Sequence, residues 1–240
     1  RRDRPIVVYG DYDVDGITAT AILVHVVRHL DPRARVRSIV PHRIDDGYGL
    51  NPRALEEIAV DGPATGVTVD CGVSARDEAE LAQALGLELL VTDHHQPVRD
   101  ERGEIAWPVA AAIAHPMGSG ADRPEPDPAD ADPLCGAGVA FKLAWALCQE
   151  ICGGTKVSEP LRRYLMQSLS LAAIGTVADV VPLVDENRIL VEHGIRMLRD
   201  EPPPGLVELM KVSNLDRSAR IEAESISFVL GPRLNAAGRL

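Results

Sequence analysis

The sequence predicts an α/β protein: a parallel β-sheet with helices on both faces, which continues into a mostly helical C-terminal segment. Two observations support this fold class. Short apolar runs alternate with segments of helical periodicity over residues 6–114, and strands separated by helices imply a parallel sheet. Beyond residue 133 the periodicity is almost entirely helical. Right-handed crossovers would place the carboxyl ends of all the strands at one edge of this sheet.

Short apolar runs mark the expected strands. Each run is too short for a buried helix, and glycine, proline or a polar residue follows it. The expected strands cover residues 6–9, 36–40, 67–69, 87–91 and 109–114.

The segments between these runs carry helix signals. Residues 18–30 place apolar side chains on successive turns. Asn51 followed by Pro52 is typical of a helix start, with a capping residue and then proline in the first turn. Ser74 is expected to cap a third helix, because acidic residues follow it closely.

The second half of the chain has a different composition. Residues 117–133 are rich in Pro, Asp, Gly and Ala without periodicity, which predicts a flexible surface loop. The sequence from 200 to 205 breaks the helical pattern again, and short helices are expected after it. The expected longer helices cover residues 139–151, 161–174 and 188–198.

Composition limits the classes of function. The chain has 240 residues, 45% hydrophobic and 25% charged, as in a globular protein with one large domain or two small ones. Lys and Arg number 25 against 36 Asp and Glu, so the net charge of −11 argues against nucleic-acid binding by a broad basic surface. Aromatic residues at 3% argue against a surface of base-stacking rings.

No apolar run reaches the roughly 18 residues of a membrane span, so no membrane partner is expected. Four cysteines in a chain of this length do not form a disulfide framework. The expected location is therefore the cytoplasm.

Acidic and histidine-bearing turns follow three of the expected strands. These turns are residues 10–16 (GDYDVDG), 70–72 (DCG) and 93–95 (DHH). Ligands of open parallel sheets bind outside the carboxyl ends of the strands, where these turns would converge. Carboxylates mixed with imidazole suit a divalent ion such as Mn²⁺ or Mg²⁺.

Each turn alone has a structural explanation. An Asp after a strand commonly caps the next helix or shapes a turn. The Asp-x-Asp-x-Asp-Gly run also resembles half of a calcium loop, but Ile22 stands where that loop has its final Glu. The occurrence of all three turns at successive strand ends favours a metal site.

Five segments, taken together and in order, resemble the motifs of the DHH phosphoesterase superfamily. The last of them is similar to a signature of the RecJ branch, the single-strand-specific 5′→3′ DNA exonucleases. The resemblance runs from Ile6 to Leu240, interrupted by the Pro/Asp-rich loop. Its segments are residues 7–20, 70–72, 93–95, 175–183 and 231–240.

The resemblance implies two metal ions, Mn²⁺ or Mg²⁺. Asp70 would bridge both ions, and Asp13 would hold one of them. Several relatives carry a histidine where this chain has Tyr9, so the site around Asp13 is expected to be poor in ligands. The implied metal ligands are Asp13, Asp15, Asp70, His94 and Asp179, of which Asp15, His94 and Asp179 would complete the other site.

A two-ion site suits phosphodiester hydrolysis. Two cations about 3.5–4 Å apart neutralise the anionic substrate, acidify a bound water and stabilise the attacking and leaving oxygens. By resemblance, His95 would meet the scissile phosphate or orient the metal ligands, and Asp11 would support those ligands from behind.

The expected substrate is single-stranded DNA with a 5′ phosphate. Arg43 follows the second strand and so lies at the same edge, and its planar guanidinium suits a terminal phosphate. By resemblance, Arg233 would help to hold DNA, with Asn235 and Arg239 in the same segment. A single-strand-binding protein or a helicase is a further expected partner.

The resemblance also implies the domain organisation and the process. Residues 1–198 would form a DHH catalytic domain, and residues 199–240 a helical segment that leads to a C-terminal domain of the DHHA1 type outside this sequence. On its own the chain is expected to bind Mn²⁺ but to degrade DNA poorly. The implied process is DNA repair and recombination.

Two alternatives remain. Besides a RecJ-type exonuclease, the chain could be a DHH phosphodiesterase that cleaves short oligonucleotides, cyclic dinucleotides or pyrophosphate, or it could be a non-catalytic DNA-binding relative. The signature in residues 231–239 argues against the first, and the filled ligand positions argue against the second.

Overall fold

A parallel five-stranded sheet forms the N-terminal half of the protein, as the sequence predicts. In the computed structural model, which describes residues 4–118, 134–215 and 220–237, the strand order is β2-β1-β3-β4-β5. The last strand starts three residues later than expected, although Ala111 N still donates to Leu89 O. The strands are β1 (Ile6–Gly10), β2 (Val36–Ile39), β3 (Thr65–Val69), β4 (Glu88–Thr92) and β5 (Ala112–Ala114).

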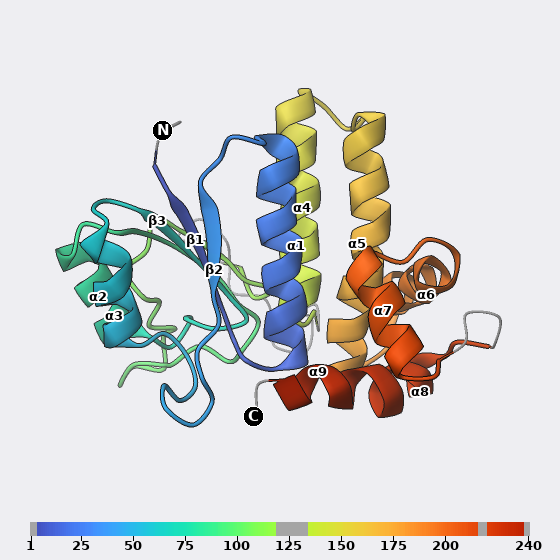
Figure 1. Cartoon of the computed structure of the whole chain (residues 1–240). Coiled ribbons are helices and arrows are strands. Elements are labelled where there is room, and N and C mark those ends of the chain that lie inside the picture. Colours follow the sequence, from blue (N-terminus) through green and yellow to red (C-terminus); the bar gives the residue numbers. More distant parts are fainter. Residues whose placement is uncertain (1–3, 119–133, 216–219, 238–240) are drawn as a thin grey trace.

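Helices cover both faces of the sheet (Figure 1). Alternate residues of β1 serve the two faces: Val8 packs in the core shared with α1, α4 and α5, and Val7 packs in the core shared with α2 and α3. This confirms the predicted layer arrangement. The helices on one face are α1 (Val14–Leu30), α4 (Gly136–Cys152) and α5 (Glu159–Ala178), and those on the other are α2 (Pro52–Val60) and α3 (Arg76–Ala84).

The C-terminal segment is helical, as expected. The break predicted at 200–205 is shorter than expected, because Pro204 already occupies the first position of α7 and proline is tolerated there. Residues 119–133 of the expected loop lie outside the described residues. The remaining elements are α6 (Asp185–Asp200), α7 (Pro204–Val212), α8 (Ala223–Ser225), the π-helix η1 (Ile226–Leu230) and α9 (Gly231–Ala237).

Two of the helix starts differ from the prediction. The cap at Asn51 is confirmed, since its side chain accepts from Ala54 N at 2.8 Å. The cap predicted at Ser74 is wrong: Ser74 lies in a turn closed by Ala75 N and Gly72 O, and α3 begins at Arg76 without a side-chain cap. Helix α1 begins four residues earlier than expected, because Asp13 accepts from Gly16 N at 2.9 Å and caps it.

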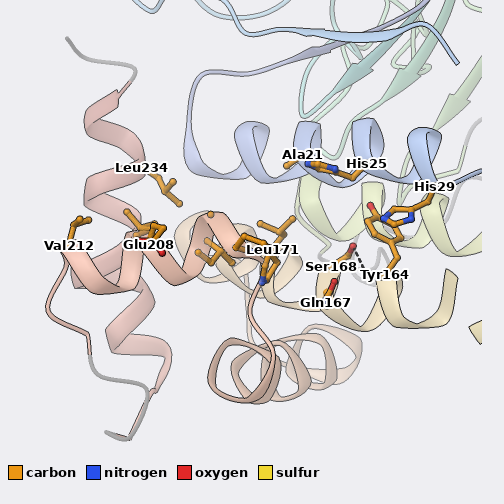
Figure 2. Close-up of a pocket in the computed structure, with 15 residues that line it drawn as sticks. Ala21, His25, His29, Tyr164, Gln167, Ser168, Leu171, Glu208, Val212 and Leu234 are labelled. Atoms are coloured by element: carbon orange, nitrogen blue, oxygen red, sulfur yellow. Dashed lines mark hydrogen bonds between the residues drawn. The ribbon is translucent and has the colours of Figure 1, made fainter. Parts of the chain in front are cut away.

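A mostly apolar hollow of about 820 Å³ lies between α1, α5 and α7. Figure 2 shows His25 and His29 of α1 beside Tyr164 of α5 at one end and Leu234 of α9 toward the other. The hollow follows the later turns of α1, whereas the acidic residues lie at its first turn. Among the described residues, no helix combines the length and the apolar character needed to cross a membrane.

Candidate metal centre

The acidic turns meet at one edge of the sheet. Strands β1, β3 and β4 are adjacent and parallel, so the turns that follow them lie side by side. The C-terminal end of α5 adds Asp179, which lies just after the last helical residue. Helix α9 contacts α1 and lies across this same end of the molecule (Figure 1).

One donor group consists of Asp15, His94 and Asp179. Their ligand atoms lie within 4.8 Å of one another. His94 Nε2 is 3.7 Å from Asp15 Oδ2 and 3.7 Å from Asp179 Oδ2. This is the grouping that the sequence suggested for one of the two ions.

A second donor group consists of Asp11, Asp13 and Asp70, again within 4.8 Å. Asp13 acts both as a helix cap and as a candidate metal ligand. One of its oxygens caps α1, and its side chain still faces this group. Asp11, which the resemblance would place behind the ligands, also offers a donor atom to this group. Tyr9 offers none here, since its hydroxyl donates to Gly49 O at 2.9 Å.

Asp70 lies where the two groups meet. Its Oδ1 is 3.0 Å from His94 Nε2 of the first group, and its carboxylate belongs to the second group. The backbone of Asp70 has a φ of 59°, a left-handed conformation that a non-glycine residue adopts at a cost. The turn after β3 therefore directs this carboxylate into the space between the two groups.

Unsatisfied buried atoms show that the site fits divalent cations. Within the part of the chain that the structure describes, Asp70 Oδ1, His94 Nε2 and Asp11 Oδ1 are buried and make no hydrogen bond of adequate geometry. Buried polar atoms without partners cost free energy, and such atoms converging on one space call for a ligand. A carboxylate–imidazole donor set is suited to Mn²⁺ or Mg²⁺.

The electrostatics lead to the same conclusion. Burial, followed by the negative charge of Asp15, raises the pKa of Asp70 well above its usual range. Burial likewise raises the pKa of Asp179 to about 7 and that of Asp11 to about 6. Burial lowers the pKa of His94, which keeps its imidazole neutral and its lone pair available. A bound cation would offset the repulsion among these carboxylates.

His95 has a different environment from His94. Asp93 Oδ1 lies 2.8 Å from His95 Nδ1 and also accepts from the backbone N–H groups of His94 and His95. Asp93 Oδ2 accepts from Val73 N. The hydrogen bond to Asp93 raises the pKa of His95, so this histidine favours the protonated form that can donate to an anion.

The expected substrate residues fall in different places. Arg43 is exposed and lies 5.0 Å above the ring of Tyr12. Burial raises the pKa of Asp11, and the charge of Arg43 partly offsets that rise, so Arg43 is close to the acidic cluster. Arg233 is exposed on α9 and donates to Val229 O. Asn235 lines a hollow of about 310 Å³ with Val180, next to Asp179 in the chain. Arg239 lies outside the described residues.

Two residues of the site had no assigned role in the sequence. Asp93 orients His95, and the only sequence signal was its place as the first member of the Asp-His-His triplet. The Tyr48 hydroxyl lies 3.2 Å from His95 Nδ1, and the Tyr48 ring packs edge-on against the imidazole. Gly47 and Gly49, which flank Tyr48, both have positive φ, and a pair of glycines in the sequence does not by itself predict this contact.

Fold and site together define a class of protein: an α/β protein with a carboxylate–imidazole metal centre at the carboxyl edge of a parallel sheet. Residues 5–176 match the family described as "DHH family, N-terminal domain". Because the match covers more than half of the chain, the protein belongs to the DHH family.

Individual relatives are more specific. The chain is 40% identical over 235 residues to the single-stranded-DNA-specific exonuclease RecJ of Bacillus subtilis (strain 168), which covers 98% of this chain and 26% of that protein. It resembles a crystal structure of exonuclease RecJ bound to manganese, with a TM-score of 0.78, 33% identity, and coverage of 98% of this chain and 53% of that one.

A crystal structure of RecJ from Thermus thermophilus in complex with Mn²⁺ is also similar, with a TM-score of 0.73, 32% identity, and coverage of 98% and 30%. The same RecJ in complex with Mg²⁺ resembles the chain as well. The chain thus spans between about a quarter and a half of the length of these relatives.

Proposed function

We propose that this chain is the catalytic part of a metal-dependent phosphodiesterase that removes nucleotides from the 5′ end of single-stranded DNA. The observation that carries the proposal is that Asp70 belongs to one donor group and lies 3.0 Å from His94 of the other, where buried atoms of Asp70 and His94 make no hydrogen bond. The names of the relatives support the substrate, and their Mn²⁺ and Mg²⁺ complexes support the metal.

We assign different roles to the metal ligands, to His95 and to Arg43. Asp15, His94 and Asp179 would hold one ion, Asp11 and Asp13 the other, and Asp70 both. Two ions so held supply charge neutralisation and an activated water for in-line displacement. His95, protonated and oriented by Asp93, donates a hydrogen bond to the phosphate, or a proton to the leaving oxygen. Arg43 binds the terminal phosphate as a two-pronged donor.

The direct test measures nucleotide release from 5′-phosphorylated single-stranded DNA by this chain, with and without Mn²⁺. From this chain alone we expect slow release that requires Mn²⁺ and is at least about 100-fold slower still on a matched blunt duplex, because a duplex end must first be opened. Equal rates on both substrates would contradict the single-strand specificity. Release without any divalent ion would contradict the mechanism.

Arg43 supplies a second prediction. Arg43→Ala is expected to raise KM for 5′-phosphorylated DNA by about 10- to 100-fold, equivalent to roughly 1.5–3 kcal/mol for a charged hydrogen-bonded pair. The same variant should change KM for 5′-hydroxyl DNA much less. Arg53→Ala, an exposed arginine of α2 paired with Glu57, is the matched control and should behave as the parent. An equal rise of KM on both substrates would mean that Arg43 does not recognise the terminal phosphate.

The finer assignments belong to the same proposal. Roles for Arg233, Asn235 and Arg239 in holding DNA, a protein partner such as a single-strand-binding protein or helicase, and work in the cytoplasm in DNA repair and recombination remain predictions. So does the division into a catalytic domain at 1–198 and a linking segment at 199–240.

A further inference from the structure

The first turn of α4 holds one of the buried carboxylates. Gly136 N donates to Asp15 Oδ2 at 2.6 Å, and Ala137 N donates to Asp15 Oδ1 at 2.9 Å. The first N–H groups of a helix have no intrahelical acceptor, and the N-terminal end of the helix dipole favours a negative charge. Asp15 is 1% exposed, so the helix takes the place that water would occupy around a surface carboxylate.

The same turn also touches the second carboxylate. A Cβ atom at position 136 would lie 2.6 Å from Asp70 Cβ, 2.7 Å from its Oδ1 and 2.8 Å from its Cγ. Gly136 is the first residue of α4 and is not among the residues with positive φ, so its backbone does not require glycine. Alanine would be the better helix former there. The glycine is therefore explained by the close approach to Asp70.

A second glycine closes the other side of Asp15. A Cβ atom at Gly175 of α5 would overlap Asp15 Oδ1 and would lie 2.6 Å from Ala137 Cβ. The carboxylate of Asp15 is thus enclosed between the first turn of α4 and the last turns of α5. Each carboxylate oxygen has two lone pairs, so one N–H group per oxygen still leaves a lone pair for a cation.

We propose that Gly136 is a positioning residue of the metal centre. It lets the first turn of α4 hold Asp15 through its N–H groups while it lies directly against Asp70, and so sets the separation of these two carboxylates. The inference rests on the proposed metal-dependent function. Its test measures metal binding and stability instead of catalysis, so that the two can fail separately.

The first test compares Mn²⁺ binding by isothermal titration calorimetry in the parent, Gly136→Ala and Gly138→Ala. We expect Gly136→Ala to weaken Mn²⁺ binding at least tenfold, because the methyl group must displace the Asp70 side chain. Gly138→Ala is the matched control in the same helical turn. Its Cβ would meet the flexible Leu134 side chain at 3.0 Å, and its Mn²⁺ affinity should match that of the parent. Parental Mn²⁺ affinity in Gly136→Ala would overturn the proposal.

The second test applies even if Gly136→Ala folds poorly. The midpoint of thermal unfolding without metal is measured for Gly136→Ala, Asp70→Gly and the double variant. Asp70 has a φ of 59°, which glycine tolerates, so Asp70→Gly removes the side chain that the new methyl group would meet. We expect the loss caused by Gly136→Ala to disappear in the Asp70→Gly background. Equal losses in both backgrounds would overturn the proposal.

The two hypotheses are distinguished by the parent protein. A parent that binds Mn²⁺ and shows the predicted coupling, but releases no nucleotide from single-stranded DNA, refutes the proposed function and leaves the role of Gly136 intact. A parent that degrades single-stranded DNA while Gly136→Ala binds Mn²⁺ normally refutes the role of Gly136 alone.

Discussion

Replacing Asp70 by asparagine is expected to abolish nuclease activity, by at least about 1,000-fold, on the order of 4 kcal/mol of transition-state stabilisation. Asp70 belongs to one donor group and lies 3.0 Å from His94 Nε2 of the other, and asparagine keeps the shape of the side chain while removing its charge. Asparagine also tolerates the left-handed backbone found at this position better than most residues do. The measurement is the rate of Mn²⁺-dependent nucleotide release.

The same variant should be more stable than the parent when no metal is bound. Because burial raises the pKa of Asp70 in the folded protein, keeping this carboxylate ionised at neutral pH opposes folding, and asparagine removes that penalty. A gain of 1 kcal/mol would raise Tm by about 2–4 °C for a chain of this size. Saturating Mn²⁺ should stabilise the parent, by about 2.7 kcal/mol at 100 times Kd, and should stabilise Asp70→Asn far less.

The exposed residue Asp61 offers the matched control. Asp61→Asn makes the same chemical change on the surface of the protein, and we expect parental activity and a parental response of Tm to Mn²⁺. If Asp70→Asn kept more than a tenth of the parental rate, the assignment of Asp70 as the shared ligand would be wrong.

Replacing His95 by alanine is expected to lower kcat by about 100- to 10,000-fold, the range typical of general acid–base groups. The loss should appear in kcat and less in KM, because the role we propose for His95 is on the phosphate in the transition state. The rise of Tm on addition of Mn²⁺ should persist, since the His94 imidazole and the carboxylates remain. Single-turnover rates and thermal unfolding with and without Mn²⁺ separate these effects.

Two further variants complete this comparison. His193→Ala changes a half-buried histidine on α6, away from the acidic turns, and should leave kcat unchanged. Asp93→Asn should lower kcat in the same direction as His95→Ala but less strongly, because the imidazole remains and loses only its orientation and its raised pKa. Loss of the Mn²⁺ response in His95→Ala would instead identify His95 as a metal ligand.

The fold and most of the candidate site were predictable from local sequence. Apolar runs that alternate with helical periodicity determine a parallel sheet, and a parallel sheet brings the turns after β1, β3 and β4 to one edge whatever their detailed shape. Asp15, Asp70 and His94 could therefore be grouped before any distance was known. The error at Ser74 concerned a single helix end, where one residue of shift changes which side chain can cap.

The resemblance to a family added what periodicity could not. Asp179 follows α5 and lies far along the chain from the other acids, so no pattern of strands and helices predicts that it joins Asp15 and His94. The resemblance of residues 175–183 to a DHH motif predicted that Asp179 belongs with these residues. Arg43, by contrast, could be placed at the correct edge because it follows β2.

Tertiary structure alone decided how these groups are held. The sequence determined the parallel sheet and the acidic turns at its carboxyl edge, and it indicated the type of metal that would suit them. These follow from local periodicity and from the chemistry of carboxylate and imidazole. The N–H groups of Gly136 and Ala137 on Asp15 and the contact of Tyr48 with His95 join residues 47 to 122 positions apart. Such contacts depend on how helices and loops pack on the sheet, and no local pattern encodes that packing.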